Sequence, residues 1–294
     1  MMRTHKKKSK LKSKGLKEDQ STTTIRSMHV KDFELSYTLE CGQFFRFFEE
    51  DRGYYIQVRD KIIYIAQPSK TKLLYKGCRQ EDIIHLFRLD ENYQMIKDML
   101  LKDDYTRLAL RRYSGLRLMR QDPWECTISY ICSAAANIPK IQLNLNLLSR
   151  CFGKRKLFDQ KEFYTFPRPG TMLCDESIRR CKTGFRTRYI HAANSYLTDR
   201  ILKDISKMSY PDAKEELMQL PGIGEKVADC ILLFSLGFDE AFPIDVWIRR
   251  IMQKLYFDGK NVQDKRILEL AGSKWGRYAG YAQEYLYMYA RMNA

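Results

Sequence analysis

The chain has 294 residues, with 52 lysines and arginines against 36 aspartates and glutamates, which gives a formal net charge of +16. It is long enough to bury a sizeable core and to form about two domains. No apolar run approaches the roughly 20 residues that span a bilayer, and the eight cysteines follow no secretory signal, so we expect an intracellular protein with reduced thiols and no membrane partner.

Residues 1–27 form a tail rich in lysine, serine and threonine, for which we expect disorder. The first 19 residues carry eight basic and two acidic side chains, a net charge of +6, so the remainder of the protein keeps +10. A body that is basic without its tail predicts a polyanionic partner.

Residues 28–115 are predicted to form an antiparallel β-sheet domain. Short aromatic and β-branched runs at 43–48, 54–59 and 62–66 are separated by turn residues at 51–53 and 59–61. Helical periodicity takes over from about residue 81, and no strand signal of that strength follows. We therefore predict an α+β fold in which this domain precedes a mostly α-helical domain over 116–294.

Several helix boundaries are legible in the second domain. Asp122 can cap a helix that runs to about residue 136, with Pro123 at its first position and Glu125 completing a capping box. Pro139 can open the next helix, which Gly153 would end. Further helices are predicted over 186–202, 246–256 and 275–292.

The stretch LPGIGEKVADC at 220–230 predicts a helix, a glycine-rich hairpin and a second helix. Pro211 can open the first helix, and Gly222 and Gly224 suit a tight turn whose N–H groups approach an anion at the start of the second. Lys226 lies on the first turns of that second helix. The pattern therefore places an amine beside a predicted phosphate site.

Asp245 follows Lys226 by nineteen residues, at the apparent start of a new helix. It is interpreted either as a plain N-cap, worth about 1 kcal/mol, or as a carboxylate that shares a cleft with Lys226, and one carboxylate can do both. Gln283 and Tyr287 lie four residues apart on one helix, so an amide that can hydrogen bond a base edge lies beside a ring that can stack on it. Cys230 falls one turn after Lys226.

The hairpin sequence followed by PID at 243–245 resembles the helix-hairpin-helix and Gly/Pro-Asp signature of the base-excision DNA glycosylases. ECGQFFR at 40–46, DPWEC at 122–126, GFRTRY at 184–189 and WGRYAGYAQ at 275–283 make the protein similar to the 8-oxoguanine DNA glycosylase branch of this HhH-GPD superfamily, over residues 30–290. The resemblance implies a bifunctional glycosylase and AP lyase that flips 8-oxoguanine out of duplex DNA. Lys226 would attack C1′ and form a Schiff base that permits β-elimination, and Asp245 would stabilise the charge developing on the sugar.

The same resemblance implies a pocket for the flipped base. Gln283 and Tyr287 would contact the base, Cys230 would close its opposite face, and the backbone C=O of Gly42 would accept the N7 hydrogen that 8-oxoguanine carries and guanine lacks. The alternatives are a core aromatic stripe for Tyr287, an inert buried thiol for Cys230 and a turn glycine for Gly42.

A further set of residues is predicted to grip DNA or to fill the gap left by the flipped base: Asn137, Lys140, Phe185, Arg186, Gly222, Gly224 and Trp247. Here the sequence departs from the family pattern. Alanines at 134–136 precede Asn137 where eukaryotic members carry an asparagine run. Lys140 occupies a position where the family usually has an arginine. Phe185 replaces the usual tyrosine at the wedge, and Trp247 replaces a histidine that is frequent in the family. Fewer donors then face the opposite strand, so we make no prediction of the base opposite the lesion.

No metal site is predicted, because the last cysteine, Cys230, precedes Asp245 and the four histidines show no ligand spacing. We expect no required cofactor and no iron–sulfur cluster, and leave open a monovalent cation held by carbonyl groups of the hairpin. The expected partner is double-stranded DNA containing 8-oxoguanine, bound by a monomer, in the cytoplasm or nucleoid of a prokaryote or the nucleus of a eukaryote.

Two alternatives keep part of this interpretation. The first is a glycosylase for alkylated or other oxidised bases, although the alkylbase enzymes that resemble this fold typically use water and lack a lysine at the position of Lys226. The second is a non-catalytic DNA-binding module that uses the hairpin as a grip, which predicts salt-dependent binding without strand scission.

Overall fold

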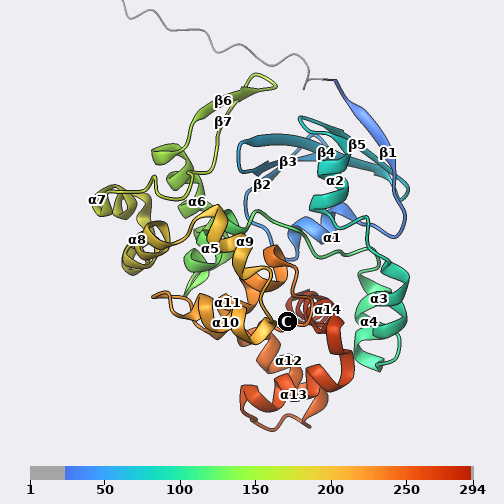
Figure 1. Cartoon of the computed structure of the whole chain (residues 1–294). Coiled ribbons are helices and arrows are strands. Elements are labelled where there is room, and N and C mark those ends of the chain that lie inside the picture. Colours follow the sequence, from blue (N-terminus) through green and yellow to red (C-terminus); the bar gives the residue numbers. More distant parts are fainter. Residues whose placement is uncertain (1–23, 293–294) are drawn as a thin grey trace, which may run out of the picture.

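A computed structural model describes residues 24–292 and has two parts, a five-stranded antiparallel sheet and a larger helical part (Figure 1). The sheet has the spatial order β1 (Arg26–His29), β5 (Lys72–Lys76), β4 (Lys61–Ser69), β3 (Gly53–Val58) and β2 (Phe47–Glu50). The α+β fold is therefore confirmed, with the sheet in the N-terminal region.

The turn residues determine the sheet's hairpins as predicted. Asp51 and Arg52 have φ of 49° and 63° between β2 and β3, and Arg59 has φ of 51° between β3 and β4, which suits tight hairpin turns. The strands begin and end differently from the sequence pattern, since residues 43–46 precede β2, and β1 and β5 were not predicted. β1 begins at Arg26, so the expected tail over residues 1–27 ends earlier than predicted. Residues 1–23 of that tail lie outside the described part.

The helices with α-helical geometry are α1 (Leu35–Glu40), α2 (Gln80–Leu86), α3 (Tyr93–Leu100), α4 (Asp104–Arg112), α5 (Pro123–Ser133), α6 (Ile138–Phe152), α7 (Asp175–Ile178), α8 (Thr187–Tyr196), α9 (Asp199–Ile205), α10 (Tyr210–Met218), α11 (Glu225–Ile231), α12 (Val246–Tyr256), α13 (Asp264–Trp275) and α14 (Ala279–Met292). The helix expected over 186–202 is divided into α8 and α9, because Leu197 and Thr198 are extended and Thr198 caps α9. The helix expected over 275–292 begins only at Ala279, after α13 and a 3-10 turn.

The start of α5 confirms the cap and corrects the capping box. Asp122 accepts a hydrogen bond from the N–H of Glu125 at 2.9 Å. The Glu125 side group does not return to the cap. It accepts hydrogen bonds from Arg46 Nη1 at 2.9 Å and from the N–H of Arg59 at 2.8 Å, and so joins the helical part to the sheet. The helix ends at Ser133, before Ala135, whose φ is 48°.

A two-stranded sheet in the second, mostly helical part was not predicted from the sequence. β6 (Arg155–Phe158) and β7 (Lys161–Tyr164) pair in antiparallel register. Phe158 and Phe163 from this hairpin pack with Tyr55 of the large sheet. The pattern is short, and both strands are half exposed, which weakens their alternation in the sequence.

Apart from the small cluster at the β6–β7 hairpin, the buried side chains form one core at the large sheet and another among the helices. The sheet core includes Phe87 and is lined by Leu89, whereas Tyr93 and Leu100 of α3 and Leu110 of α4 belong to the helical core. α3 and α4 therefore pack with the helices although they precede the expected domain boundary near residue 115, while Met119, beyond that boundary, packs with the sheet.

Candidate active site

In the hairpin between α10 and α11, the backbone conformation requires a glycine at one position. Gly222 has φ of 87°, and a Cβ there would lie 2.3 Å from the ring of Tyr189. Gly224 has an ordinary φ of −93° and open space around it, so it precedes α11 without the conformational need that we expected. Asp229 of α11 accepts hydrogen bonds from Tyr210 Oη at 2.6 Å and Lys214 Nζ at 3.0 Å, which hold the two helices of the motif together.

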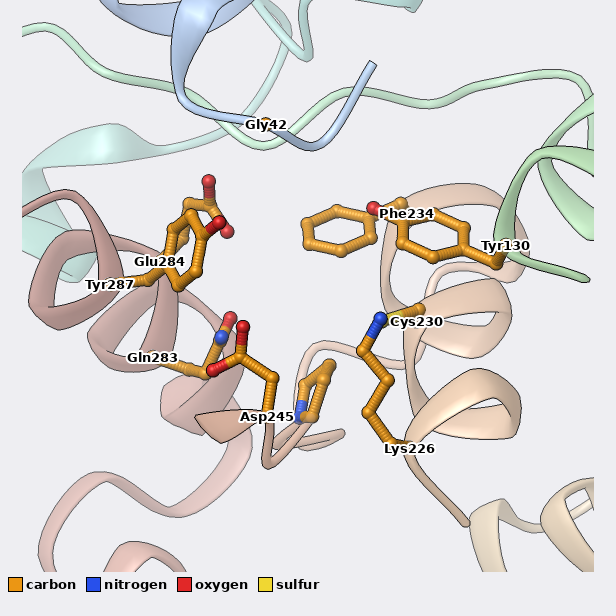
Figure 2. Close-up of a pocket in the computed structure, with 10 residues that line it drawn as sticks. Gly42, Tyr130, Lys226, Cys230, Phe234, Asp245, Gln283, Glu284 and Tyr287 are labelled. Carbon is orange, nitrogen blue, oxygen red and sulfur yellow. The ribbon is translucent and has the colours of Figure 1, made fainter. Parts of the chain in front are cut away.

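Lys226 and Asp245 line one pocket from different sides, as Figure 2 shows. Lys226 Nζ donates to Ser133 Oγ at 3.4 Å and lies 5.0 Å from the centre of the Tyr130 ring. Asp245 Oδ1 accepts the N–H of Ile248 at 2.8 Å and so caps α12. The capping interpretation of Asp245 is thus correct, and the cap also fixes the carboxylate at the edge of the pocket.

The pocket has facing walls that come from different helices (Figure 2). Cys230 and Phe234 lie on the side of α11, and Gln283 and Tyr287 on the side of α14. Burial raises the pKa of the Cys230 thiol to about 12, so this wall is an uncharged thiol at neutral pH. The structure therefore brings the residues predicted from both helices around one cavity.

Gly42 forms part of the pocket from the segment after α1. Its φ is 106°, a region that favours glycine, and a Cβ there would lie 3.5 Å from the Tyr287 ring and 3.4 Å from Arg291 Nη1. Arg291, which the sequence did not point to, donates from Nη1 to the C=O of Glu40 at 2.9 Å and of Cys41 at 3.2 Å. The last turn of α14 thus holds the segment directly before Gly42.

The position of α14 depends on a close backbone approach. The N–H of Gly280 donates to the C=O of Asp239 at 2.8 Å, and a Cβ at Gly280 would lie 2.2 Å from Leu233. Because no side chain intervenes, the helix that carries Gln283 and Tyr287 lies directly against the segment that leads to Asp245.

A wider cleft adjoins the pocket and is lined by Asn137, Trp247 and Arg249 together with Lys226 and Asp245. Asn137 caps α6 by accepting the N–H of Lys140 at 3.0 Å, and Trp247 is 38% exposed. These two predicted contact residues therefore share a surface with the amine and the carboxylate.

The remaining predicted contact residues do not line this cleft. Lys140 Nζ donates to the C=O of Lys182 at 2.9 Å. Phe185 is 53% exposed, and its ring makes an edge contact with Tyr189. Arg186 is buried and donates through Nε to the C=O of Ala134 at 2.8 Å, so in the protein without DNA it holds the α5–α6 turn.

A buried carboxyl group, Glu284, is the pocket residue that the sequence interpretation missed. It is 2% exposed, and its Oε1 has no hydrogen-bond partner among the described residues, as is also true of Gln283 Oε1. Burial, reinforced by Asp245, raises the pKa of Glu284 to about 7, against a smaller lowering by the Cys41 thiol. A glutamate within an otherwise apolar helix face was the available signal.

Within residues 24–292, His, Cys, Asp and Glu side chains form no group of three that could hold a metal ion, and all eight cysteines are free. No helix in that part of the protein is long and apolar enough to cross a membrane. The chain is basic and contains a glycine-rich helical hairpin, which makes it a helix-hairpin-helix protein. Beside the hairpin, an amine and a carboxylate share a pocket with aromatic and thiol walls, which suits a flat polar ring.

Comparisons with known proteins agree with this class. Residues 26–127 match the family model of the 8-oxoguanine DNA glycosylase N-terminal domain, and residues 210–234 match the helix-hairpin-helix motif. A probable N-glycosylase/DNA lyase of Methanothermobacter thermautotrophicus is 33% identical over 255 residues, 78% of each chain. The N-glycosylase/DNA lyase of Saccharomyces cerevisiae is 28% identical over 308 residues, which cover 86% of this chain and 82% of that one.

A solved structure extends the similarity to the whole fold. The Clostridium acetobutylicum 8-oxoguanine glycosylase/lyase, in complex with double-stranded DNA containing cytosine opposite 8-oxoguanine, is 29% identical with a TM-score of 0.85, over 93% of this chain and 99% of that one. The chain belongs to the 8-oxoguanine DNA glycosylase family of the HhH-GPD superfamily.

Proposed function

We propose that this protein is a bifunctional DNA glycosylase and AP lyase that excises 8-oxoguanine from duplex DNA, with Lys226 as its nucleophile. The observation that carries this proposal is the arrangement of Lys226 and Asp245 at one pocket whose other walls include Cys230 and Tyr287. A base can enter this pocket only after leaving the stack, which exposes C1′ of its sugar to the amine.

Lys226 acts as an unprotonated amine that attacks C1′. The bond from C1′ to the base breaks, its electron pair leaves with the base, and the base takes up a proton. Asp245 stabilises the positive charge that develops on the sugar and assists proton movement. The remaining proton on the nitrogen passes to O4′ as the C1′–O4′ bond breaks and the sugar opens, which gives an imine. Removal of a C2′ proton then expels the 3′ phosphate and cuts the strand.

Recognition of the lesion falls to groups around the pocket. The C=O of Gly42 accepts the N7 hydrogen of 8-oxoguanine, which guanine lacks, while Cys230 and Tyr287 lie against the two faces of the ring. Gln283 meets the polar edge of the base, and its unpartnered Oε1 supports that role because buried acceptors are normally satisfied.

The DNA surface combines the hairpin, the cleft and the exposed Phe185. The hairpin around Gly222 and Gly224 grips a phosphate, Asn137 and Trp247 contact the strand in the cleft, and Phe185 fills the gap left by the flipped base. We propose that the monomer acts where the DNA is, in the nucleoid or the nucleus according to the cell, without a required cofactor. A monovalent cation at the hairpin carbonyls is compatible with this scheme.

Borohydride trapping tests the chemistry. Incubation with a duplex containing 8-oxoguanine and borohydride is expected to link the protein covalently to DNA, because the imine is reduced to a stable amine. Lys226→Gln is expected to lose both the adduct and strand scission. Equal trapping by this variant, or no adduct with the unaltered protein, would contradict the proposed nucleophile.

The alternatives are separated by the choice of substrate. Faster release of 3-methyladenine than of 8-oxoguanine under single-turnover conditions would favour an alkylbase glycosylase. Salt-sensitive binding to DNA with no scission of any lesion duplex would favour a passive hairpin module.

A further inference from the structure

Two buried oxygen atoms of adjacent residues in the pocket have no partner among the described residues. They are Gln283 Oε1 and Glu284 Oε1, on residues that are 4% and 2% exposed. Both residues line the pocket, and Figure 2 shows the Glu284 carboxyl group near Tyr287, on the side of the pocket towards Gly42. A buried polar atom without a partner is costly, and two of them side by side at a cavity indicate a ligand that supplies the missing hydrogen bonds.

We propose that Glu284 is a further specificity-determining residue, whose carboxyl group in its protonated form donates a hydrogen bond to a carbonyl oxygen of the flipped base. This inference rests on the proposed function. It assigns a contact to the base that the pair Lys226 and Asp245 and the acceptor of Gly42 do not provide.

The chemistry of the base requires a donor at this position. In 8-oxoguanine, N7–H lies between two carbonyl groups, at C6 and C8. A base whose N7–H meets the C=O of Gly42 therefore turns a carbonyl oxygen towards any group beside Gly42. Glu284 is such a group, since it lies close to the thiol of the preceding residue, Cys41. An ionised carboxylate can only accept hydrogen bonds and would repel that oxygen, whereas a carboxylic acid donates to it.

The surroundings of Glu284 favour the acid. Its Oε1 has no hydrogen-bond partner among the described residues, and burial of a carboxylate with an unsatisfied oxygen is unfavourable. Burial is the largest effect on the pKa of Glu284 and Asp245 adds like charge, whereas the Cys41 thiol and Arg291 lower the pKa, and the net result is a pKa of about 7. The other titratable groups at Glu284 or its pocket are Cys41 from the segment after α1, Tyr130 from α5, Lys226 and Cys230 from α11, and Tyr287 and Arg291 from α14.

Gln283 supplies the complementary group. Its unpartnered Oε1 is an acceptor, and the N1–H and amino group of a guanine-type base are donors. Gln283 thus presents an acceptor and Glu284 a donor to the same ring. A single base would then form the hydrogen bonds that both unpartnered oxygen atoms lack.

Binding without catalysis tests this role. Lys226→Gln protein and the double variant Lys226→Gln/Glu284→Gln are titrated with an 8-oxoguanine duplex at pH 6 and pH 8. From pH 6 to pH 8 the dissociation constant of the Lys226→Gln protein is expected to rise about tenfold more than that of the double variant. The double variant should respond less because a glutamine keeps its amide donor at both pH values. Both proteins share every other titrating group, so the difference isolates Glu284.

Two further measurements complete the experiment. Glu284→Ala in the same background is expected to bind the lesion duplex about tenfold more weakly at pH 6 than Glu284→Gln, while all variants bind a duplex with a tetrahydrofuran abasic site equally, since it offers no base. The same pH response with and without Glu284, or equal binding by the alanine and glutamine variants, overturns this inference. No preference of the Lys226→Gln protein for the lesion duplex over an undamaged one at pH 6 instead overturns the proposed function.

Discussion

Two buried carboxyl groups, Glu125 at the junction of sheet and helices and Glu284 in the pocket, have opposite surroundings. Glu125 has a cation and a backbone N–H as partners, from Arg46 and Arg59, whereas Glu284 has an oxygen without a partner. Burial raises the pKa of both. The comparison teaches that a buried carboxylate with a cation and an N–H as partners joins two parts of the fold, while one with an unpartnered oxygen at a cavity can still bind a ligand.

Removal of the cation at the junction is expected to have the largest effect on stability. Arg46→Met leaves Glu125 buried without its charge partner and also removes the hydrogen bonds from Arg46 to Gln57 and Tyr164. The free energy of unfolding is expected to fall by about 3–5 kcal/mol in chemical denaturation. The matched control Arg46→Met/Glu125→Gln removes both charges and should lose less. A loss below about 1 kcal/mol in the single variant would show that the pair of Arg46 and Glu125 does not hold the sheet and the helical part together.

The pocket carboxyl group is expected to show itself in the pH dependence of stability. Its pKa is about 7 in the folded protein and near 4.5 when unfolded, so its contribution is complete below pH 4.5 and is lost as the pH rises through 7. Glu284→Gln removes this titration. Between pH 5 and pH 8 the unaltered protein should therefore lose about 2.5 kcal/mol of unfolding free energy relative to the variant. Parallel curves for the two proteins would show that Glu284 is ionised in the free pocket.

The contrast also explains what the sequence could predict. Turn residues, proline positions and apolar periodicity act locally, so α5, α6, α12 and the hairpin were predicted close to their positions. Lys226, Asp245, Gln283 and Tyr287 were predicted from motif spacing, and the structure brings all four to one pocket. What escaped prediction depends on contacts between segments far apart in sequence.

Three residues illustrate the limit. Glu125 has the spacing of a capping box, yet Arg46, 79 residues earlier, attracts its carboxylate instead. Arg186 resembles a surface contact next to the exposed Phe185, but the carbonyl groups of the α5–α6 turn bury it. Glu284 is adjacent to a predicted residue, and only the packing of α14 against the segment at Cys41 shows that its carboxyl group faces the pocket.

A smaller effect is expected from the arginine that holds the segment before Gly42. Arg291→Gln loses a charged donor to the carbonyl groups of Glu40 and Cys41, which should lower the rate of 8-oxoguanine excision under single-turnover conditions by about tenfold and stability by about 1 kcal/mol. Arg291→Lys keeps a charged donor and should recover part of the rate. An unchanged excision rate in the glutamine variant would show that Gly42 keeps its position without this contact.

The smallest effect on stability is expected at Phe185, which is 53% exposed and outside both of the buried regions compared above. Phe185→Ala should change the free energy of unfolding by less than about 0.5 kcal/mol, because exposed positions contribute little. Affinity for an 8-oxoguanine duplex should nevertheless fall by about tenfold, since stacking of an aromatic ring on a base contributes about 1–3 kcal/mol. Phe185→Tyr keeps the ring and serves as the matched control. If the alanine variant binds as tightly as the tyrosine variant, the gap left by the flipped base is filled by another group, and exposure at this position has no role in DNA binding.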